Sequence, residues 1–223
     1  MKLPITERLA VVSEMVAKNK ILCDIGCDHG YLPLKLLSDE KTDFVYACDV
    51  NDGPLLTARK NFDKFSLSDK ADFIKGDGLK AVWDKSFDAV TICGMGGRLI
   101  AKILDDKRDI LTENHQIILQ PMKDAYFLRE YLSENNFFIK KEALAREDRR
   151  YYNIIEVKSG KKQMLSLLNS HTGMEFIDKN SPLFYEYLKK QHEKFTKMLY
   201  LKNGHENTES LKKLIFELEK VLN

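Results

Sequence analysis

Short apolar runs alternate with helix-like segments through the first two thirds of this 223-residue sequence, and this alternation is the strongest constraint on its fold. Such runs predict buried strands, and segments with apolar residues at helical spacing predict the helices that cover them. The expected strands span residues 21–25, 44–49, 71–75, 87–93 and 115–120, and the expected helices span 5–17, 31–38, 54–66, 97–111 and 124–135. Strands that alternate with helices form βαβ units, so we expect an α/β protein with a parallel sheet.

The pattern changes after residue 120, where two strand-like segments, Phe137 to Glu142 and Tyr151 to Lys158, are joined by a charged loop. No segment between them is long enough for a helical crossover, and strands joined without a crossover pair antiparallel. We therefore expect a Rossmann-like sheet of the class I methyltransferase kind, mostly parallel with an antiparallel terminal hairpin. A flavodoxin-like sheet is the less favoured alternative.

The sequence beyond Ser159-Gly160 has no β character. Residues 181–202 and 207–222 carry apolar side chains at spacings of three and four, and residues 203–207 read as a turn, so an antiparallel, coiled-coil-like helical hairpin is expected. We divide the chain into a cofactor-binding domain, 1–159, and a helical domain, 160–223. Homodimerisation would also use such stripes, but a hairpin within one chain satisfies them, so we expect a monomer.

Composition favours a cytoplasmic protein. Hydrophobic residues make up 43% of the chain, yet no apolar stretch is long enough for a membrane span, and the first residues lead into a charged amphipathic segment. The four cysteines form no Cys-x-x-Cys pair and no histidine lies at ligand spacing, so no metal site is expected. Residues 158–223 hold 12 lysines against 8 acidic residues, a surplus compatible with binding a phosphate backbone or with a solvated helical surface.

A glycine turn follows the first apolar run and reads Asp24-Ile-Gly-Cys-Asp-His-Gly30. In dinucleotide folds, glycines in this turn let backbone N–H groups approach a pyrophosphate. Asp28 stands inside the turn, and its carboxylate would repel a pyrophosphate but suit a ligand with ribose, ammonium or sulfonium groups. The turn therefore favours S-adenosylmethionine over NAD.

Acids and glycines recur at the ends of the next three strands. Asp49 lies 23 residues after Gly26, where an acid accepts hydrogen bonds from ribose hydroxyls. Asp77 lies between two glycines, and its carboxylate is suited to an adenine amino group. The fourth run leads into Gly94-Met95-Gly96-Gly97. Each signal alone is a common turn or helix cap, but in this order they predict one crevice at the carboxyl edge of the sheet.

Several polar residues are candidates for contact with a nucleic-acid substrate, each with an ordinary structural alternative. Tyr31 is suited to stack on a base or to pack on the sheet, and Gln120-Pro121 is placed to offer an amide acceptor to an exocyclic amine. The remaining candidates are the basic residues of the predicted hairpin loop, Arg146, Arg149 and Arg150, which lie beside two tyrosines.

These motifs together resemble the bacterial tRNA (adenine-22, N1)-methyltransferases over nearly the whole chain. The resemblance rests on Arg8-Leu9, residues 24–33, residues 49–54, Gly76-Asp-Gly-Leu79, residues 94–97 with Leu99-Ile100, Leu119-Gln-Pro-Met122 and the C-terminal helical hairpin. The Asp-His pair and the Gly-Met-Gly-Gly turn are its most specific parts. Cys27 and Gly30 stand where the family often has serine and alanine, and Cys27 gives the loop a potential sensitivity to oxidation.

The resemblance implies a Rossmann-like methyltransferase domain, a helical C-terminal domain, S-adenosylmethionine as methyl donor, S-adenosylhomocysteine as product and bacterial tRNA as substrate. The cofactor-binding residues it implies, taken with the motifs above, are Asp24, Gly26, Asp28, His29, Gly30, Asp49, Val50, Asn51, Gly76, Asp77, Gly78, Leu79, Gly94 and Met95. The target base is expected near Gly94 to Gly97, with Tyr31, Gln120, Pro121, Arg149 and Arg150 as further substrate contacts.

Asp28 and His29 are the candidate catalytic residues. Transfer of a methyl group to adenine N1 leaves positive charge on the base, and the Asp28 carboxylate is placed either to stabilise it or only to anchor the cofactor. His29 is suited to proton transfer or to orienting the loop.

Other functions remain open at the level of sequence. The absence of an Asn/Asp-Pro-Pro-Tyr motif disfavours methylation of adenine N6, and the absence of a Pro-Cys pair near a catalytic loop disfavours covalent C5 chemistry on pyrimidines. The alternatives are a methyltransferase for a small molecule or another RNA adenine, and a cofactor-sensing RNA-binding module without catalysis.

Overall fold

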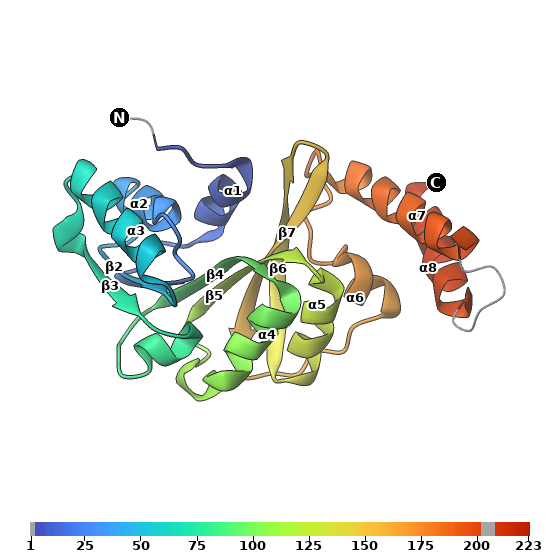
Figure 1. Cartoon of the computed structure of the whole chain (residues 1–223). Coiled ribbons are helices and arrows are strands. Elements are labelled where there is room, and N and C mark those ends of the chain that lie inside the picture. Colours follow the sequence, from blue (N-terminus) through green and yellow to red (C-terminus); the bar gives the residue numbers. More distant parts are fainter. Residues whose placement is uncertain (1–2, 202–207) are drawn as a thin grey trace.

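One mixed sheet organises the protein. The computed structural model describes residues 3–201 and 208–223. Within these residues a seven-stranded sheet has the order β3-β2-β1-β4-β5-β7-β6 (Figure 1). The strands are β1 Ile21–Ile25, β2 Phe44–Asp49, β3 Ala71–Lys75, β4 Ala89–Gly96, β5 Gln116–Lys123, β6 Phe137–Glu147 and β7 Arg150–Ser159. The first five are parallel and β7 is antiparallel to both of its neighbours, which confirms the predicted architecture.

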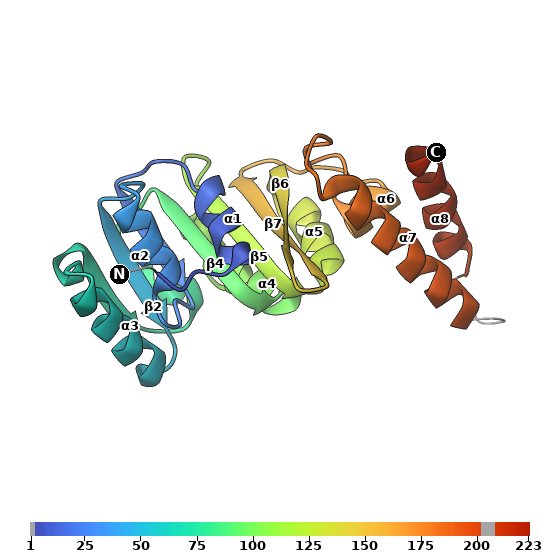
Figure 2. The same ribbon diagram turned by 90° about the horizontal axis from the view of Figure 1, so that it is seen from above.

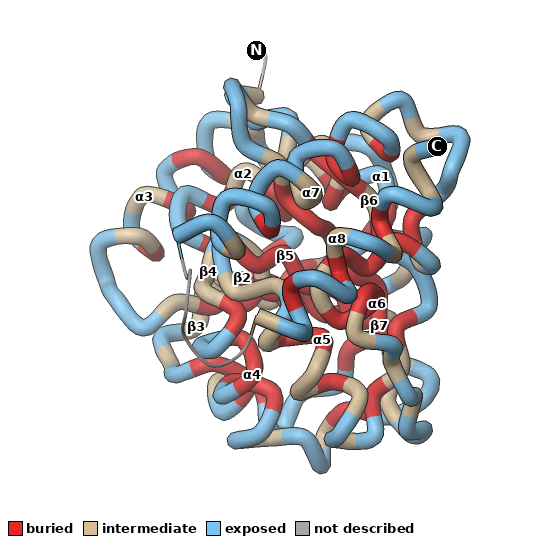
Figure 3. The backbone as a smooth tube through the Cα atoms, turned by 90° about the vertical axis from the view of Figure 1, so that its right-hand side faces the viewer, coloured by how far each residue is buried: buried red, intermediate tan, exposed pale blue. Residues whose placement is uncertain are grey.

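Helices cover both faces of the sheet (Figure 2). On one face lie α1 Glu7–Met15, α2 Tyr31–Ser38 and α3 Asp52–Lys64, and on the other lie α4 Gly97–Asp106 and α5 Ala125–Glu134. Short 3-10 turns span Ser68–Lys70, Gly78–Val82 and Arg108–Ile110. Figure 3 shows the buried backbone concentrated at the centre, under helices whose outer turns are exposed.

Local signals set the helix boundaries. The Thr6 side chain accepts a hydrogen bond from the Leu9 N–H and caps α1, as a residue of this type does at a helix start. Gly97 begins α4 where a side chain does not fit, because a Cβ there would lie 2.4 Å from the Asp124 carbonyl oxygen. The close approach of β4–α4 to the β5–α5 turn therefore requires glycine at this position.

The hairpin that ends the sheet is longer than the sequence predicted. The prediction that a loop begins after Glu142 is wrong, because β6 continues to Glu147 and β7 begins at Arg150. Asp148 has φ +54, the left-handed conformation that tight hairpins use. Arg146 and Arg150 are consequently strand residues, and Arg149 belongs to the turn.

The C-terminal segment contains α6 Leu167–Thr172, which the sequence did not predict, then α7 Phe184–Leu201 and α8 Thr208–Leu222. The two long helices pack through Phe184, Leu188, Phe195, Leu211, Leu214 and Leu218, all buried. The predicted helical hairpin is thus present as a helix pair, whereas its predicted turn, 203–207, lies outside the described residues.

A buried ion pair joins this segment to the sheet. Arg129 of α5 and Glu142 of β6 are both fully buried and form a two-pronged contact, Nε to Oε1 at 2.7 Å and Nη2 to Oε2 at 2.8 Å. Arg129 also donates to the carbonyl oxygens of Ser170, His171 and Thr172 at the end of α6, which have no partner within the helix. Burial by itself lowers the pKa of Arg129. The charge and hydrogen bonds of Glu142 outweigh this effect and raise the pKa overall, so the guanidinium stays charged.

Replacing Arg129 with methionine leaves the Glu142 carboxylate buried without its partner. We expect Arg129→Met to lower the free energy of unfolding by about 3–5 kcal/mol, measured by urea denaturation followed by circular dichroism. The control is Lys190→Met, which removes an exposed ion pair to Glu193 and should change stability by less than about 1 kcal/mol. Equal losses in the two variants would contradict the role of the buried pair.

Candidate active site

A cleft of about 570 Å³ opens at the carboxyl ends of the central strands. Strand order reverses between β1 and β4, and open α/β sheets bind ligands in the crevice at such a point. The predicted cofactor residues that line this cleft are Gly26, Asp28, Asp49, Val50, Asn51, Gly76, Asp77, Gly78, Gly94 and Met95. The other lining residues were not predicted to bind the cofactor, although all except Cys93 and Ile103 belong to the motifs of the resemblance; they are Arg8, Ile25, Pro54, Cys93, Leu99, Ile103 and Met122.

A second, slightly larger cavity of about 630 Å³ lies at the opposite edge of the sheet, beside the starts of β1 and β4. Its walls carry Lys20, Asp88 and Glu156, and none of the predicted glycine turns or strand-end acids borders it. Position and chemistry therefore make the carboxyl-edge cleft the candidate active site.

The loop after β1 is shaped by left-handed backbone. Gly26, Asp28 and Gly30 have φ values of +76°, +50° and +72°. The N–H groups of Gly26 and Cys27 both donate to the Cys48 carbonyl oxygen, at 2.8 and 2.9 Å, which fastens the loop to β2. A Cβ on Gly26 would lie 2.1 Å from the Met95 methyl carbon, so the loop and the end of β4 meet across the cleft.

The strand-end acids face one space. Asp49 accepts a hydrogen bond from the Asn51 N–H at 2.9 Å, and its other oxygen lies 3.4 Å from the Asp28 N–H. The Asp28 side chain is 71% exposed, so it remains available to a ligand. Asp77 also lines the cleft and is exposed.

Asp24 is the buried acid of the site. It is 3% exposed, and its Oδ1 accepts a hydrogen bond from Thr91 Oγ1 at 2.6 Å. Burial raises the pKa of Asp24 to about 6, an effect that the Thr91 hydrogen bond opposes and the Asp49 charge reinforces. Together with Asp28 and Tyr31 it borders a small cavity of about 100 Å³ beside the main cleft.

Arg8 borders the cleft, and the sequence indicated no role for it. It reaches over from α1 and donates from Nη1 to Gln120 Oε1 at 2.6 Å, and the same oxygen accepts the Gly94 N–H at 3.0 Å. The Arg8 Nε is buried without a hydrogen-bond partner in the described part of the chain, because Glu147 Oε2 lies 3.9 Å away. Arg8-Leu9 was visible only as part of the family resemblance.

Other predicted residues lie away from the cleft walls. Gln120 is fully buried with its amide oxygen already engaged, and Leu79 belongs to the core under α4. The His29 ring is half exposed, 3.8 Å from Asp28 Oδ1, and does not border the cleft. Gly30 packs on Phe62 and Ala58.

The remaining predicted substrate residues are distributed along the edge. Gly96 lies against the Lys123 side chain, and Gly97 serves the packing at the start of α4. Pro121 borders a neighbouring cavity on the side of α7. Arg149 and Arg150 are exposed at the hairpin tip, and Arg146 pairs with Glu186 at 2.7 Å.

The cysteines are unreactive in this environment. Burial raises the pKa of each thiol, to about 12 for Cys48, so all four are protonated at neutral pH. Cys27 in particular is buried, which argues against the oxidation sensitivity expected for it. Among residues 3–201 and 208–223, no three metal-binding side chains cluster, and no helix is both long and apolar enough to cross a membrane.

Comparison with known proteins bears on this geometry. The family described as tRNA (adenine(22)-N(1))-methyltransferase matches residues 22–222. The Bacillus subtilis tRNA (adenine(22)-N(1))-methyltransferase is 35% identical over 159 residues, covering 71% of this chain and 67% of that protein. The chain belongs to this family. Its function is therefore methyl transfer to N1 of adenine 22 in tRNA, as predicted.

Two solved members of the family carry the expected cofactor or its product. The Streptococcus pneumoniae protein Sp1610 in complex with S-adenosylmethionine is 32% identical, with a TM-score of 0.84 over 98% of this chain and all of that one. M. capricolum TrmK in complex with S-adenosylhomocysteine is 32% identical, with a TM-score of 0.80 over 98% of this chain and 97% of that one. These structures agree with the predicted cofactor of this methyltransferase.

The buried acid gives the free methyltransferase a testable pH dependence. Because the pKa of Asp24 is higher in the folded protein than in the unfolded chain, the folded state holds the extra proton between pH 4 and 6. The contribution of Asp24 to the free energy of unfolding therefore falls with rising pH, by up to about 1.4 kcal/mol per pH unit in this window. Asp24→Asn keeps an acceptor for Thr91 without the charge, so its stability relative to wild type should rise from pH 4 to pH 7 in urea titrations. A constant difference would contradict a raised pKa.

Proposed function

We propose that the carboxyl-edge cleft holds S-adenosylmethionine and presents its methyl group to N1 of adenine 22, with the residues of this chain in the roles given below. The observation that carries the proposal is the convergence of acids from the ends of β1, β2 and β3 on the same cleft as Arg8. A volume of about 570 Å³ falls in the range of cofactor sites, roughly 300–1,000 Å³.

The charges of the cleft fit the two ends of the cofactor. Asp49 and Asp77 are proposed to accept hydrogen bonds from the ribose hydroxyls and the adenine amino group. The backbone of Gly26 leaves room for the methionine end, and Asp24 and Asp28 lie beside it to attract its positive groups. The Arg8 guanidinium, which borders the cleft, is proposed to donate to the methionine carboxylate.

The target adenine is proposed to enter between the Gly94-Met95 turn and the exposed apolar side chains of Leu99 and Met122, which are 48% and 40% exposed. N1 is paired in a duplex, so the base has to be unpaired or flipped out to reach this position. These apolar side chains favour contact with the face of a base and exclude water from the reacting atoms.

When bound, S-adenosylmethionine supplies an electrophilic methyl group, and its transfer to N1 moves one positive charge from sulfur to the base. The N1 lone pair needs no general base, so the task of the protein is to position the base and to stabilise the charge. Asp28 is proposed to stabilise the positive base through its exposed carboxylate, held toward the cleft by the left-handed loop. His29 is proposed to orient Asp28, 3.8 Å away.

The remaining roles concern the tRNA as a whole. We propose that Arg149, Arg150 and the lysines of α7 and α8 contact tRNA phosphates, that residues 160–223 act as a separate RNA-binding domain, and that the chain works as a cytoplasmic monomer. Pairing of the α7 and α8 apolar faces within one chain supports the monomer.

Replacing Asp28 with asparagine tests its electrostatic role. With saturating S-adenosylmethionine and unmodified tRNA transcript, we expect wild type to produce a reverse-transcription stop at adenine 22. Asp28→Asn should lower the single-turnover rate by about tenfold or more, because a charge that stabilises the transition state is lost. The matched control is Asp39→Asn, an exposed acid after α2 that should keep the wild-type rate. An unchanged rate with weakened cofactor binding would restrict Asp28 to anchoring.

The assignment of Arg8 is tested by binding alone. We expect Arg8→Ala to weaken S-adenosylmethionine binding by about tenfold or more in isothermal titration calorimetry, as loss of a charged hydrogen bond predicts. For the analogue that lacks the carboxylate, decarboxylated S-adenosylmethionine, wild type and variant should bind equally. Equal losses for both ligands would show that Arg8 acts only through Gln120 and Gly94.

A further inference from the structure

The cavity that Pro121 borders adjoins the active-site cleft at Met122, which lines both. It has a volume of about 250 Å³ and lies between the end of β5, the start of α5, the start of β7, α6 and α7. The space equals several water molecules, each about 30 Å³, and is smaller than the cleft. A single base or nucleoside fits it, whereas a cofactor of two or more units does not.

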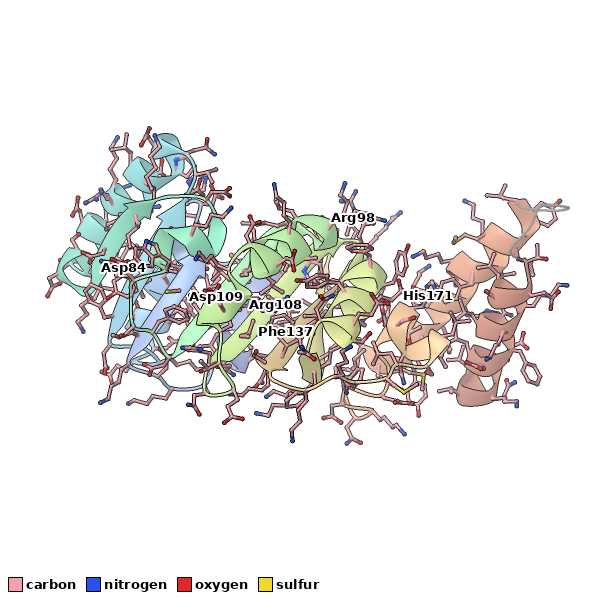
Figure 4. All side chains as sticks on the ribbon, turned by 90° about the horizontal axis from the view of Figure 1, so that it is seen from below. Asp84, Arg98, Arg108, Asp109, Phe137 and His171 are labelled. Carbon is pink, nitrogen blue, oxygen red and sulfur yellow. The ribbon has the colours of Figure 1, made fainter. Side chains whose placement is uncertain are left out.

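We call this cavity, which is lined by residues of β5, α5, β7, α6 and α7, the junction pocket. An aromatic stack forms one of its walls. The rings of Tyr126 and His171 are parallel to within 3°, with centroids 5.0 Å apart, and Phe195 packs edge-on to His171 at 5.5 Å. Tyr126 is 38% exposed. Figure 4 shows His171 between α5 and the two C-terminal helices. A rigid aromatic surface of this kind, beside an active site for RNA, is suited to stacking a base.

Positive charge lies at the rim of the same pocket. Lys123 lines it from β5 and Lys194 from α7, and the Lys194 Nζ also lies over the Phe195 ring, 5.8 Å from its centroid. Burial lowers the pKa of His171, and the nearby Lys194 and Arg129 charges lower it further, so its ring is neutral at pH 7. The Asp124 side chain also borders the pocket and is an acceptor for base amino or ribose hydroxyl groups.

We propose that the junction pocket binds a second unpaired nucleotide of the tRNA, with its base against Tyr126 and its phosphate between Lys123 and Lys194. The inference rests on the proposed function, because it assumes that the adjoining cleft holds the target adenine. It adds a recognition site outside the cofactor cleft and assigns it a ligand class, an unpaired ribonucleotide.

The spacing of the two sites is fixed by the fold. His171 lies in the last turn of α6, and its carbonyl oxygen accepts a hydrogen bond from Arg129, which is itself paired with Glu142. Tyr187 of α7 donates its hydroxyl to the Thr172 carbonyl oxygen at 3.0 Å, which fastens the other wall. The pocket therefore keeps a set position relative to the cleft, and selects RNA in which two unpaired nucleotides match that separation.

The first test uses the full-length protein and tRNA transcripts with a single abasic nucleotide at each unpaired position near adenine 22. For wild type, we expect one position other than 22 at which loss of the base weakens binding about tenfold, the usual size of one base–aromatic stack. Tyr126→Ala should weaken binding of intact tRNA by a similar factor. The variant should bind the tRNA that is abasic at that one position as tightly as it binds intact tRNA. S-adenosylmethionine affinity should stay at the wild-type value.

Matched variants separate stacking from folding. Tyr126→Phe keeps the ring and should bind tRNA like wild type, and Tyr185→Ala removes an exposed α7 tyrosine outside the pocket and should also bind normally. Lys194→Ala should reduce the dependence of tRNA affinity on salt.

Three results would overturn the inference. They are unchanged tRNA binding by Tyr126→Ala, a loss that is the same for every abasic position, and a loss of S-adenosylmethionine binding, which would assign the pocket to the cofactor. Failure of the proposed function is seen separately, as absence of methylation at adenine 22 by wild type.

Discussion

The reversal of strand order between β1 and β4 is the constraint on which the site depends. β1 pairs in parallel with β2 on one side and β4 on the other, so the chain leaves the carboxyl ends of β1 and β4 in opposite directions. The loops part there and leave a crevice that main-chain geometry alone creates. Gly26 and Asp28 enter it from one side, and Gly94 and Met95 enter it from the other.

The charge pattern of this crevice sets its ligand class. Carboxylates at positions 28, 49 and 77 would oppose a pyrophosphate, since charges interact strongly where water is partly excluded. The Arg8 guanidinium, which is oriented by Gln120, borders the same cleft and also the small cavity beside Asp28. A ligand with both positive and negative groups finds a partner for each in this lining, whereas a purely anionic ligand finds one only in Arg8.

The sequence predicted what depends on local pattern. Strand-end acids such as Asp49 were identifiable because each follows an apolar run, and the parallel sheet then brings them together. Arg8 was not assigned because its role comes from α1 lying over a hairpin 139 residues away, where its N–H bonds to Glu147. The length of that hairpin was missed because residues 143–147 read Ala-Leu-Ala-Arg-Glu, a run with few of the residue types that favour strands. The six residues of α6 are too few to show helical periodicity.

The antiparallel hairpin also explains how α7 comes to lie beside the carboxyl edge of the sheet. Because β7 runs opposite to β5, its first residues lie at the carboxyl edge, and Tyr151 there packs 5.9 Å from Tyr187 of α7. The chain then leaves β7 at the amino edge of the sheet and has to return to the carboxyl edge before α7 begins. The grip of Arg129 on the last carbonyl groups of α6 fixes that return path, and the Arg146–Glu186 ion pair holds the start of α7 at the hairpin tip. If β7 were parallel to β5, its last residues, and not its first, would lie at the carboxyl edge of the sheet. Because β7 is antiparallel, the start of α7 lies at the hairpin tip and α6 lies against Arg129, so the C-terminal segment contacts the sheet domain at two separate places.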